Sequence, residues 1–194
     1  MKRIELILII TCIISIILDF ALVHRGFIMY SMLSLALFYL IFCFAVFNSI
    51  RFKSLFCKDS YNGIGTLKIL GAIFTGIILF IEIFGILAFL IDLPFALASL
   101  FIGSLFLTII SIIGGVKYFQ KKSNYYVQVL KRVLVFWLLN IVFVSIMPQS
   151  TWLNIKYRNY PEYLEVLKEK RNSPFDIELL KKEMALRDEI YKRK

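Results

Sequence analysis

Charge is scarce in this chain, and its distribution indicates the class of protein. Only 19% of the 194 residues are charged, 60% are hydrophobic, and the mean hydropathy is +0.80. Soluble domains contain about 45–50% apolar residues. The apolar residues here also form long unbroken runs, where a soluble protein would show alternation or a one-sided helical pattern. We therefore expect lipid, and not water, to surround most of the chain.

Several other absences exclude classes of function. Three cysteines, Cys12, Cys43 and Cys57, are too few and too scattered for a disulfide framework. The single histidine, His24, cannot supply a bis-imidazole haem site or a His-rich metal cluster. The sequence has no Walker-type glycine loop and no HExxH, CxxC or GxSxG motif. We therefore expect a protein that is not an enzyme and has no cofactor or metal site.

The apolar runs predict an all-α, polytopic transmembrane helical bundle. A hydrocarbon core of roughly 30 Å needs about 20 helical residues, and in lipid a helix satisfies its own backbone groups. The fifth run reaches this length only with residues suited to the water interface. We predict a transmembrane domain over residues 1–149 and an amphipathic helical tail over residues 150–194. The expected spans are residues 4–22, 27–50, 69–91, 95–116 and 133–149.

The basic residues predict an orientation. Two Lys or Arg precede the first span, and the successive connections hold one, four, none and five. By the positive-inside rule the N-terminus is cytoplasmic, where anionic lipid headgroups, and not nucleic acid, explain the basic surface. The tail is then outside, although it holds 11 Lys and Arg of its own. A re-entrant or surface-lying fifth segment would instead place the tail inside, and the sequence leaves this open.

An internal repeat is indicated by aligning the chain with itself at an offset of 68 residues. Leu22 then falls on Leu90, and Ser31 falls on Ser99, without gaps. Two tandem hairpins followed by a fifth helix would give this pattern. The alternative is that lipid-facing segments share a common composition.

The second of these hairpins resembles a known one. The stretch from Gly85 to Ala96, followed by residues 100–103, is similar to the transmembrane hairpin of the gliding-motility and type 9 secretion motor membrane subunit of Bacteroidota. The resemblance implies a small bacterial inner-membrane protein of related construction. The motor's proton-linked glutamate aligns with Leu107, so a motor role is not implied. The matching residues are Gly85, Pro94, Ala96, Leu100, Ile102 and Gly103, whereas Asp92, Leu93 and Phe95 depart from the pattern.

Glu82 is the sharpest candidate for a functional group. It lies near the middle of the third span, where a charged side chain costs roughly 2.5–3.5 kcal/mol. A proton or ion site is one interpretation, with Asn140, or a hydroxyl such as that of Thr108, as its neighbour. The other is a protonated carboxyl that makes an interhelical hydrogen bond.

Two further sets of residues predict packing surfaces. In the first span Glu5, Cys12, Ser15 and Asp19 share one helical stripe, which we expect to face protein. Small residues at three- and four-residue spacing let helices approach closely, either within the chain or in a partner subunit. The candidates for such a surface are Gly71, Gly76, Ser99 and Gly103.

The tail predicts two amphipathic helices. The first begins at Pro161, and the second has Ser173 as N-cap with Asp176 in the capping-box position. Because a segment this short cannot bury a large core alone, we expect it to dock on the membrane surface or on a partner. The residues of the predicted docking stripe are Tyr160, Tyr163, Leu164 and Leu167.

Two functions are compatible with these features. The first is a non-enzymatic membrane subunit or accessory protein that associates with other membrane proteins or with itself. The alternative is a small proton- or ion-coupled transporter component in which Glu82 titrates. A membrane enzyme ranks third, because the acid, base and nucleophile groups that it needs at one depth are missing.

Overall fold

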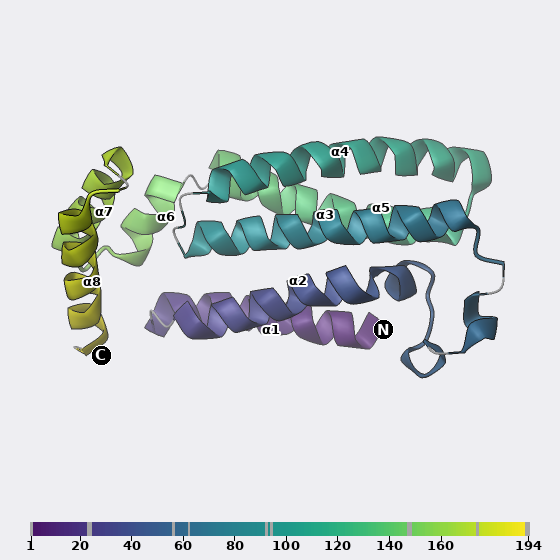
Figure 1. The fold of residues 1–194 in the computed structure, drawn as a ribbon, viewed down its shortest axis with the longest axis horizontal. Helices are drawn as coiled ribbons and strands as arrows, with labels where there is room; N and C mark the ends of the chain where they lie inside the picture. The colour runs from purple at the N-terminus through teal and green to yellow at the C-terminus, as the bar shows by residue number, and fades with distance from the viewer. Residues whose placement is uncertain are drawn as a thin grey trace.

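The computed structural model is helical, with no β-strand in the part of the chain that it describes. Five long helices form an antiparallel bundle, and three short helices follow at one end (Figure 1). The helices are α1 (Lys2–Leu22), α2 (Arg25–Phe47), α3 (Thr66–Leu90), α4 (Ala96–Lys121), α5 (Asn124–Ile141), α6 (Gln149–Lys156), α7 (Pro161–Asn172) and α8 (Ile177–Lys192). The described residues are 2–22, 25–55, 57–61, 63–91, 93, 95–146, 149–173 and 175–192.

Within the described residues, four helical stretches are long and apolar enough to cross a membrane. They are Gly26–Phe47, Thr66–Leu90, Ala96–Lys121 and Asn124–Ser145. The predicted polytopic helical bundle is therefore confirmed. Helix α1 is 21 residues long and packs beside α2, and its crossing, which would make five, stays a prediction.

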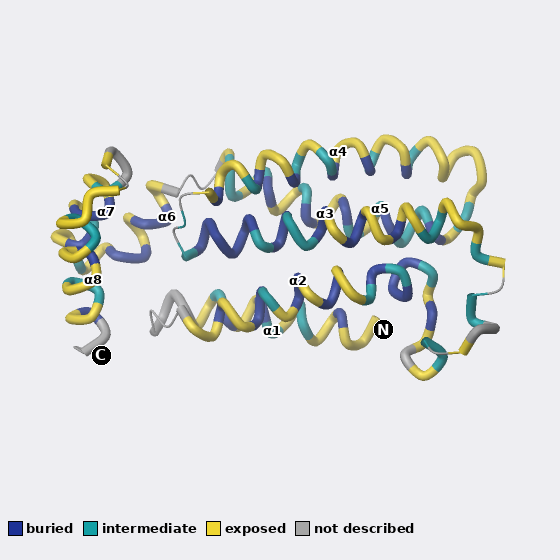
Figure 2. Tube along the Cα trace, viewed as in Figure 1, coloured by how far each residue is buried: buried dark blue, intermediate teal, exposed yellow. Residues whose placement is uncertain are grey.

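Helix α3 is the centre of the bundle. Two thirds of its apolar window (67%) is buried, against 44% for α2, 28% for α4 and 22% for α5. Figure 2 shows the same contrast, with α3 mostly buried toward the tail of the chain and α4 exposed along its outer face. In a bilayer, that outer face of α4 would contact lipid.

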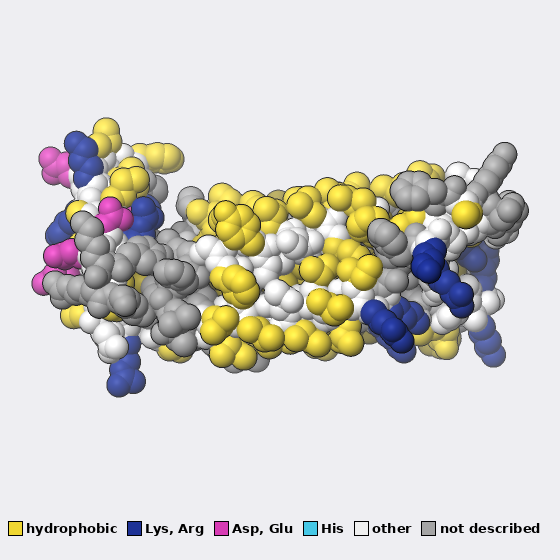
Figure 3. All heavy atoms as spheres, turned by 90° about the horizontal axis from the view of Figure 1, so that it is seen from below, with side chains coloured by type: hydrophobic (Ala, Val, Ile, Leu, Met, Phe, Trp, Pro, Cys, Tyr) yellow, Lys and Arg dark blue, Asp and Glu magenta, His cyan; other side chains and the backbone are white. Residues whose placement is uncertain are grey.

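The two ends of the bundle differ in chemistry. One end, here the basic end, carries the N-terminus, residues 48–65 with the 3₁₀ turns η1 (Phe52–Ser54) and η2 (Lys58–Tyr61), and the turn from α4 to α5. The other, the tail end, carries α6, α7 and α8. Figure 3 shows a hydrophobic belt between them, with Lys and Arg gathered at the basic end and both signs of charge at the tail end.

The helix that contains the predicted fifth span begins earlier than that span. We placed it at residues 133–149, but the helix starts at Asn124 and continues through a π-helical turn, η3 (Val142–Ile146). Lys131 and Arg132 interrupt the apolar run, so hydropathy alone moved the start past them. By length and composition the stretch Asn124–Ser145 could cross a membrane, and whether it crosses or is re-entrant stays a prediction.

The tail docks on the end of its own bundle. Trp152 of α6 is buried, and its indole N–H donates to the carbonyl oxygen of Leu90, the last residue of α3, at 3.3 Å. The rings of Tyr157 and Tyr163 meet edge to face at 4.7 Å, which joins α6 to α7. Helices α7 and α8 then cross the tail end roughly perpendicular to the bundle (Figure 1).

The cap of the last helix differs from the prediction. Asp176, and not Ser173, caps α8, because its Oδ1 accepts from the backbone N–H of Glu178 at 2.9 Å and of Leu179 at 3.3 Å. Ser173 instead follows the end of α7. Both residues are good N-caps, so the sequence offered two candidate start points, of which the second is used.

Candidate functional site

Glu82 lies in the interior of the bundle, as its position in the third span predicted. It sits on the central helix α3 and is fully buried, with 0% of its surface exposed. The structure brings it together with Asn140 of α5, whose side-chain amide donates to Glu82 Oε1 at 2.5 Å. The same amide nitrogen donates to the carbonyl oxygen of Leu100 on α4 at 2.8 Å. Asn140 therefore connects three helices at the depth of the carboxyl group.

The second oxygen of the carboxyl group is not satisfied. Glu82 Oε2 is buried and has no hydrogen-bond partner among the described residues. It points at Gly103 of α4, where an added Cβ would collide with it. An unpaired carboxylate oxygen at this depth is costly. Because no donor in the described part of the chain reaches Oε2, a neutral carboxyl group is less costly at this depth than an anion.

Thr108, the other neighbour that we considered for Glu82, lies elsewhere. It is exposed on α4, donates to the carbonyl oxygen of Ser104 at 2.8 Å, and accepts from the indole N–H of Trp137 at 3.1 Å. Of the two candidates, Asn140 alone contacts Glu82 in the described structure. A role of Glu82 and Asn140 in binding a proton or an ion stays a prediction.

Three of the four predicted small residues, Gly76, Ser99 and Gly103, pack against other helices of the chain. A Cβ on Gly76 would meet Cys43 Sγ and, at 2.8 Å, the carbonyl oxygen of Tyr39, so α2 and α3 pack backbone to backbone there. Ser99 of α4 lies against Gly85 of α3, with 3.2 Å between Ser99 Cβ and the position of an added Cβ. Gly103 makes room for Glu82, as described above. Gly71 is exposed, and its nearest neighbour would be the hydroxyl of Tyr125 at 3.4 Å.

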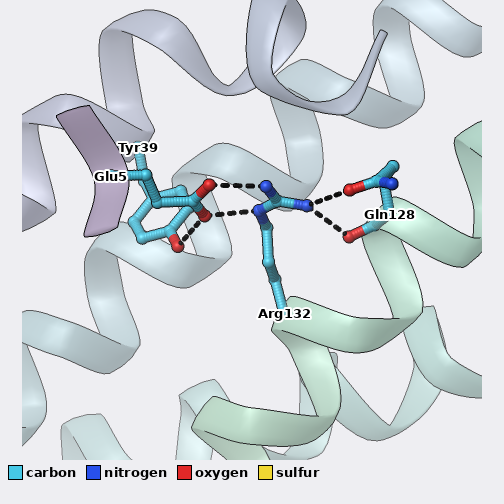
Figure 4. A network of polar contacts seen from close by, with 4 residues as sticks. All are labelled: Glu5, Tyr39, Gln128 and Arg132. Carbon is cyan, nitrogen blue, oxygen red and sulfur yellow. Dashed lines mark hydrogen bonds and ion pairs between the residues drawn. The ribbon is translucent and has the colours of Figure 1, made fainter. Parts of the chain in front are cut away.

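A second buried ionisable cluster lies near the basic end. The guanidinium of Arg132 on α5 binds both carboxylate oxygens of Glu5 on α1, at 2.5 Å each. Glu5 Oε1 also accepts from the hydroxyl of Tyr39 on α2 at 2.6 Å. Arg132 Nη1 donates to the side-chain and backbone oxygens of Gln128 at 3.0 and 2.9 Å. Figure 4 shows the four side chains converging from three helices.

Sequence reasoning missed this cluster. Glu5 was placed on the polar stripe of the first span, and Arg132 was one of the five basic residues counted in the connection between the fourth and fifth spans. The available signal was a pair of opposite charges, each at the basic end of an apolar run. An isolated charge there is costly unless it is paired, so a pairing of these two residues was open to prediction.

The stripe on the first helix faces protein, as predicted for the residues that can be placed. Glu5, Cys12 and Ser15 are all buried. The hydroxyl groups of Ser15 and Ser31 are hydrogen-bonded at 2.6 Å, which joins α1 to α2. The side chain of Asp19 lies outside the described residues.

An apolar cleft, the α1–α5 seam, separates the first helix from the fifth. It has a volume of about 540 Å³ and runs from the Glu5–Arg132 ion pair toward the tail end. Among the described residues, the polar contacts between α1 and α5 are those of this ion pair. The lining side chains are apolar apart from that cluster and Lys131, and include Ile9, Cys12, Ile13, Ile16, Val135, Leu139 and Phe143.

The stripe predicted for tail docking packs within the chain. Tyr163 and Leu167 are buried, and Tyr160 and Leu164 are partly buried. Lys170 of α7 pairs with Glu183 of α8 at 2.6 Å, and Arg187 approaches the same carboxylate at 4.0 Å. A partner would therefore meet another face of the hairpin, and docking on a partner stays a prediction.

Comparisons with protein families, with curated proteins and with solved structures give no match. The resemblance to the Bacteroidota motor hairpin is untested by them and stays a prediction.

Proposed function

We propose that this chain is a non-enzymatic integral membrane subunit that associates with another membrane protein through the α1–α5 seam. Its place would be the inner membrane of a bacterium, with the basic end in the cytoplasm and the tail outside. The observation that carries the proposal is the incomplete contact between α1 and α5. Helix α1 packs on α2, but toward α5 it makes one ion pair above an open apolar cleft.

The chemistry of the seam favours a helix of a partner protein as the occupant. The apolar walls at membrane depth suit side chains such as Leu and Ile. At the basic end, unlike a purely cationic rim, the cleft contains the carboxylate of Glu5 paired with Arg132. The side chain of Gln128 lines it too, so this end suits the polar side chains of a helix better than an anionic headgroup. Interhelical hydrogen bonds of this kind contribute to helix association in membranes.

Filling the seam tests the proposal. Ile13 and Val135 line the seam and are half exposed, so tryptophan there should fold but block an incoming helix. In gentle detergent extracts, Ile13→Trp or Val135→Trp should reduce the recovered partner by about tenfold. The matched control is Ile112→Trp on the outer face of α4, which is equally exposed and should retain the partner. Equal recovery from all three variants, each monodisperse, would contradict the proposal.

A second candidate function follows from the unpaired oxygen of Glu82. In this alternative the chain is a component of a small proton- or ion-coupled transporter, and Glu82 releases and takes up the proton. The bare Oε2 and its single amide neighbour on Oε1 support it. Glu82→Gln in reconstituted vesicles should then abolish proton-coupled uptake while the protein still assembles. Unchanged uptake in that variant would eliminate this candidate and leave the subunit proposal intact.

A further inference from the structure

A second groove, lined by other residues than the seam, opens at the basic end. It has a volume of about 620 Å³ and lies between the first turns of α3, the last turns of α4 and the start of α5. Farther from the basic end its walls are apolar, with Phe74 of α3 and Ile109 and Ile113 of α4 among the lining side chains. It therefore joins the end of the bundle to its hydrocarbon-facing surface.

The rim of this groove is cationic. Lys68 of α3 and Lys117 and Lys121 of α4 line it, and no acidic residue does. None of these lysines forms an ion pair within the described part of the chain. Lys117 makes one long contact to Gln120 at 3.4 Å, and Lys68 lies over the ring of Tyr125 at 5.9 Å. Their ammonium groups therefore remain available to an anion.

The groove stays open next to the lysines because of the residues that form its walls. Gly71 of α3 lines it and contributes no side chain, and a Cβ there would meet the hydroxyl of Tyr125 at 3.4 Å. Gly114 of α4 also lines it, but Leu130 packs against that glycine. Tyr125 holds the start of α5 beside α3, because its hydroxyl donates to the carbonyl oxygen of Lys68 at 3.0 Å. A flexible acyl chain fits such a space, whereas the headgroup that it carries would lie at the lysine rim.

We propose that this groove binds an anionic phospholipid, with its phosphate at Lys68, Lys117 and Lys121 and an acyl chain between α3 and α4. Charge complementarity selects the occupant. Three cations without a carboxylate suit a headgroup with net negative charge, and the apolar walls suit its acyl chain. Basic pockets between transmembrane helices are known sites for anionic headgroups.

Native mass spectrometry of the purified full chain tests the proposal, with phosphatidylglycerol and phosphatidylcholine of identical acyl chains as probes. Phosphatidylglycerol should bind at one saturable site and phosphatidylcholine should not. Lys117→Gln combined with Lys121→Gln should weaken the binding of phosphatidylglycerol by roughly 30-fold, since each cation near an anionic headgroup contributes attraction.

The matched control removes two charges at the same end but outside the groove. Arg51 and Lys53 are exposed there, and their paired change to Gln should leave the saturable site intact. Equal losses in the two pairs, or equal binding of both lipids, would overturn the proposal, because either result means diffuse attraction to a basic surface.

A groove-filling variant separates the acyl site from the headgroup site. Gly71→Leu places a side chain between the walls and should weaken phosphatidylglycerol binding with all lysines present. Gly115→Leu is the control, because a Cβ on Gly115 meets nothing within 4 Å. If Gly71→Leu binds the lipid as the unmodified chain does, no acyl chain occupies the groove and the proposal fails.

Discussion

The bundle core around α3 and the α1–α5 seam are built on different principles, although each contains a buried glutamate. In the core, glycines bring backbones together and the carboxyl group of Glu82 keeps one oxygen unpaired. In the seam the helices stay apart, and the carboxylate of Glu5 is bound by a guanidinium and a phenol.

The contrast shows what each glutamate can do. Glu5 is fully compensated, so its ion pair serves to hold α1 against α5. Glu82 is half compensated, so it could change its protonation without losing Asn140. The same residue type therefore supports a structural contact in one region and a candidate exchange site in the other. Substitutions in the core and in the seam test this difference.

Removing the guanidinium from the seam should have the largest effect. Arg132→Ala leaves Glu5 buried without its cation, at an expected cost of about 3–5 kcal/mol in unfolding free energy. Reversible unfolding in mixed micelles measures this. Glu5→Ala combined with Arg132→Ala should recover most of the loss. Lys131→Ala is the control, because Lys131 is exposed one residue away and should change stability little.

Adding a methyl group where α2 and α3 approach each other in the core should lower the unfolding free energy by a smaller amount. Gly76→Ala pushes a methyl group against the backbone of Tyr39 and should destabilise the protein by about 1–3 kcal/mol. Gly115→Ala is the matched helical glycine with open space around it, and it should be neutral or stabilising by up to about 1 kcal/mol. Equal effects in the same unfolding assay would mean that α2 and α3 are not in backbone contact.

The two glutamates should respond differently to the same isosteric change. Glu82→Gln keeps an acceptor for Asn140 and should shift the unfolding free energy by less than about 1 kcal/mol, the size of one membrane hydrogen bond. Glu5→Gln removes the charge that Arg132 binds and should cost more. A larger cost at Glu82 would reverse the comparison.

The hydroxyl pair between α1 and α2 should have the smallest effect. Ser15→Ala removes a 2.6 Å hydrogen bond to Ser31, which retains the carbonyl oxygen of Ile28 as a partner at 3.0 Å. The expected cost is about 0.6 kcal/mol. A cost near that of Arg132→Ala would mean that the serine contact, and not the ion pair, holds α1 in place.

The fold was largely predictable because hydropathy and helix length follow directly from the lipid environment. The start of α5 could not be predicted in this way, because Arg132 interrupts the apolar run. Hydropathy does not show that Glu5 on another helix pairs with this arginine. The contact of Glu82 with Asn140 was predictable, because polar side chains at a similar depth in a membrane form hydrogen bonds between helices. The bare oxygen over Gly103 and the open seam depend on how helices are arranged in space, which periodicity does not specify.

Site-specific photo-crosslinking in native membranes tests the central claim, that the seam receives a partner helix. A photoreactive side chain at Ile13 or Val135 should give one discrete protein adduct, whose crosslinked peptide lies in an apolar segment of another membrane protein or of a second copy. The same group at Phe101 or Ile112, on the exposed face of α4, should give lipid adducts. Lipid adducts alone at all four positions would contradict the account.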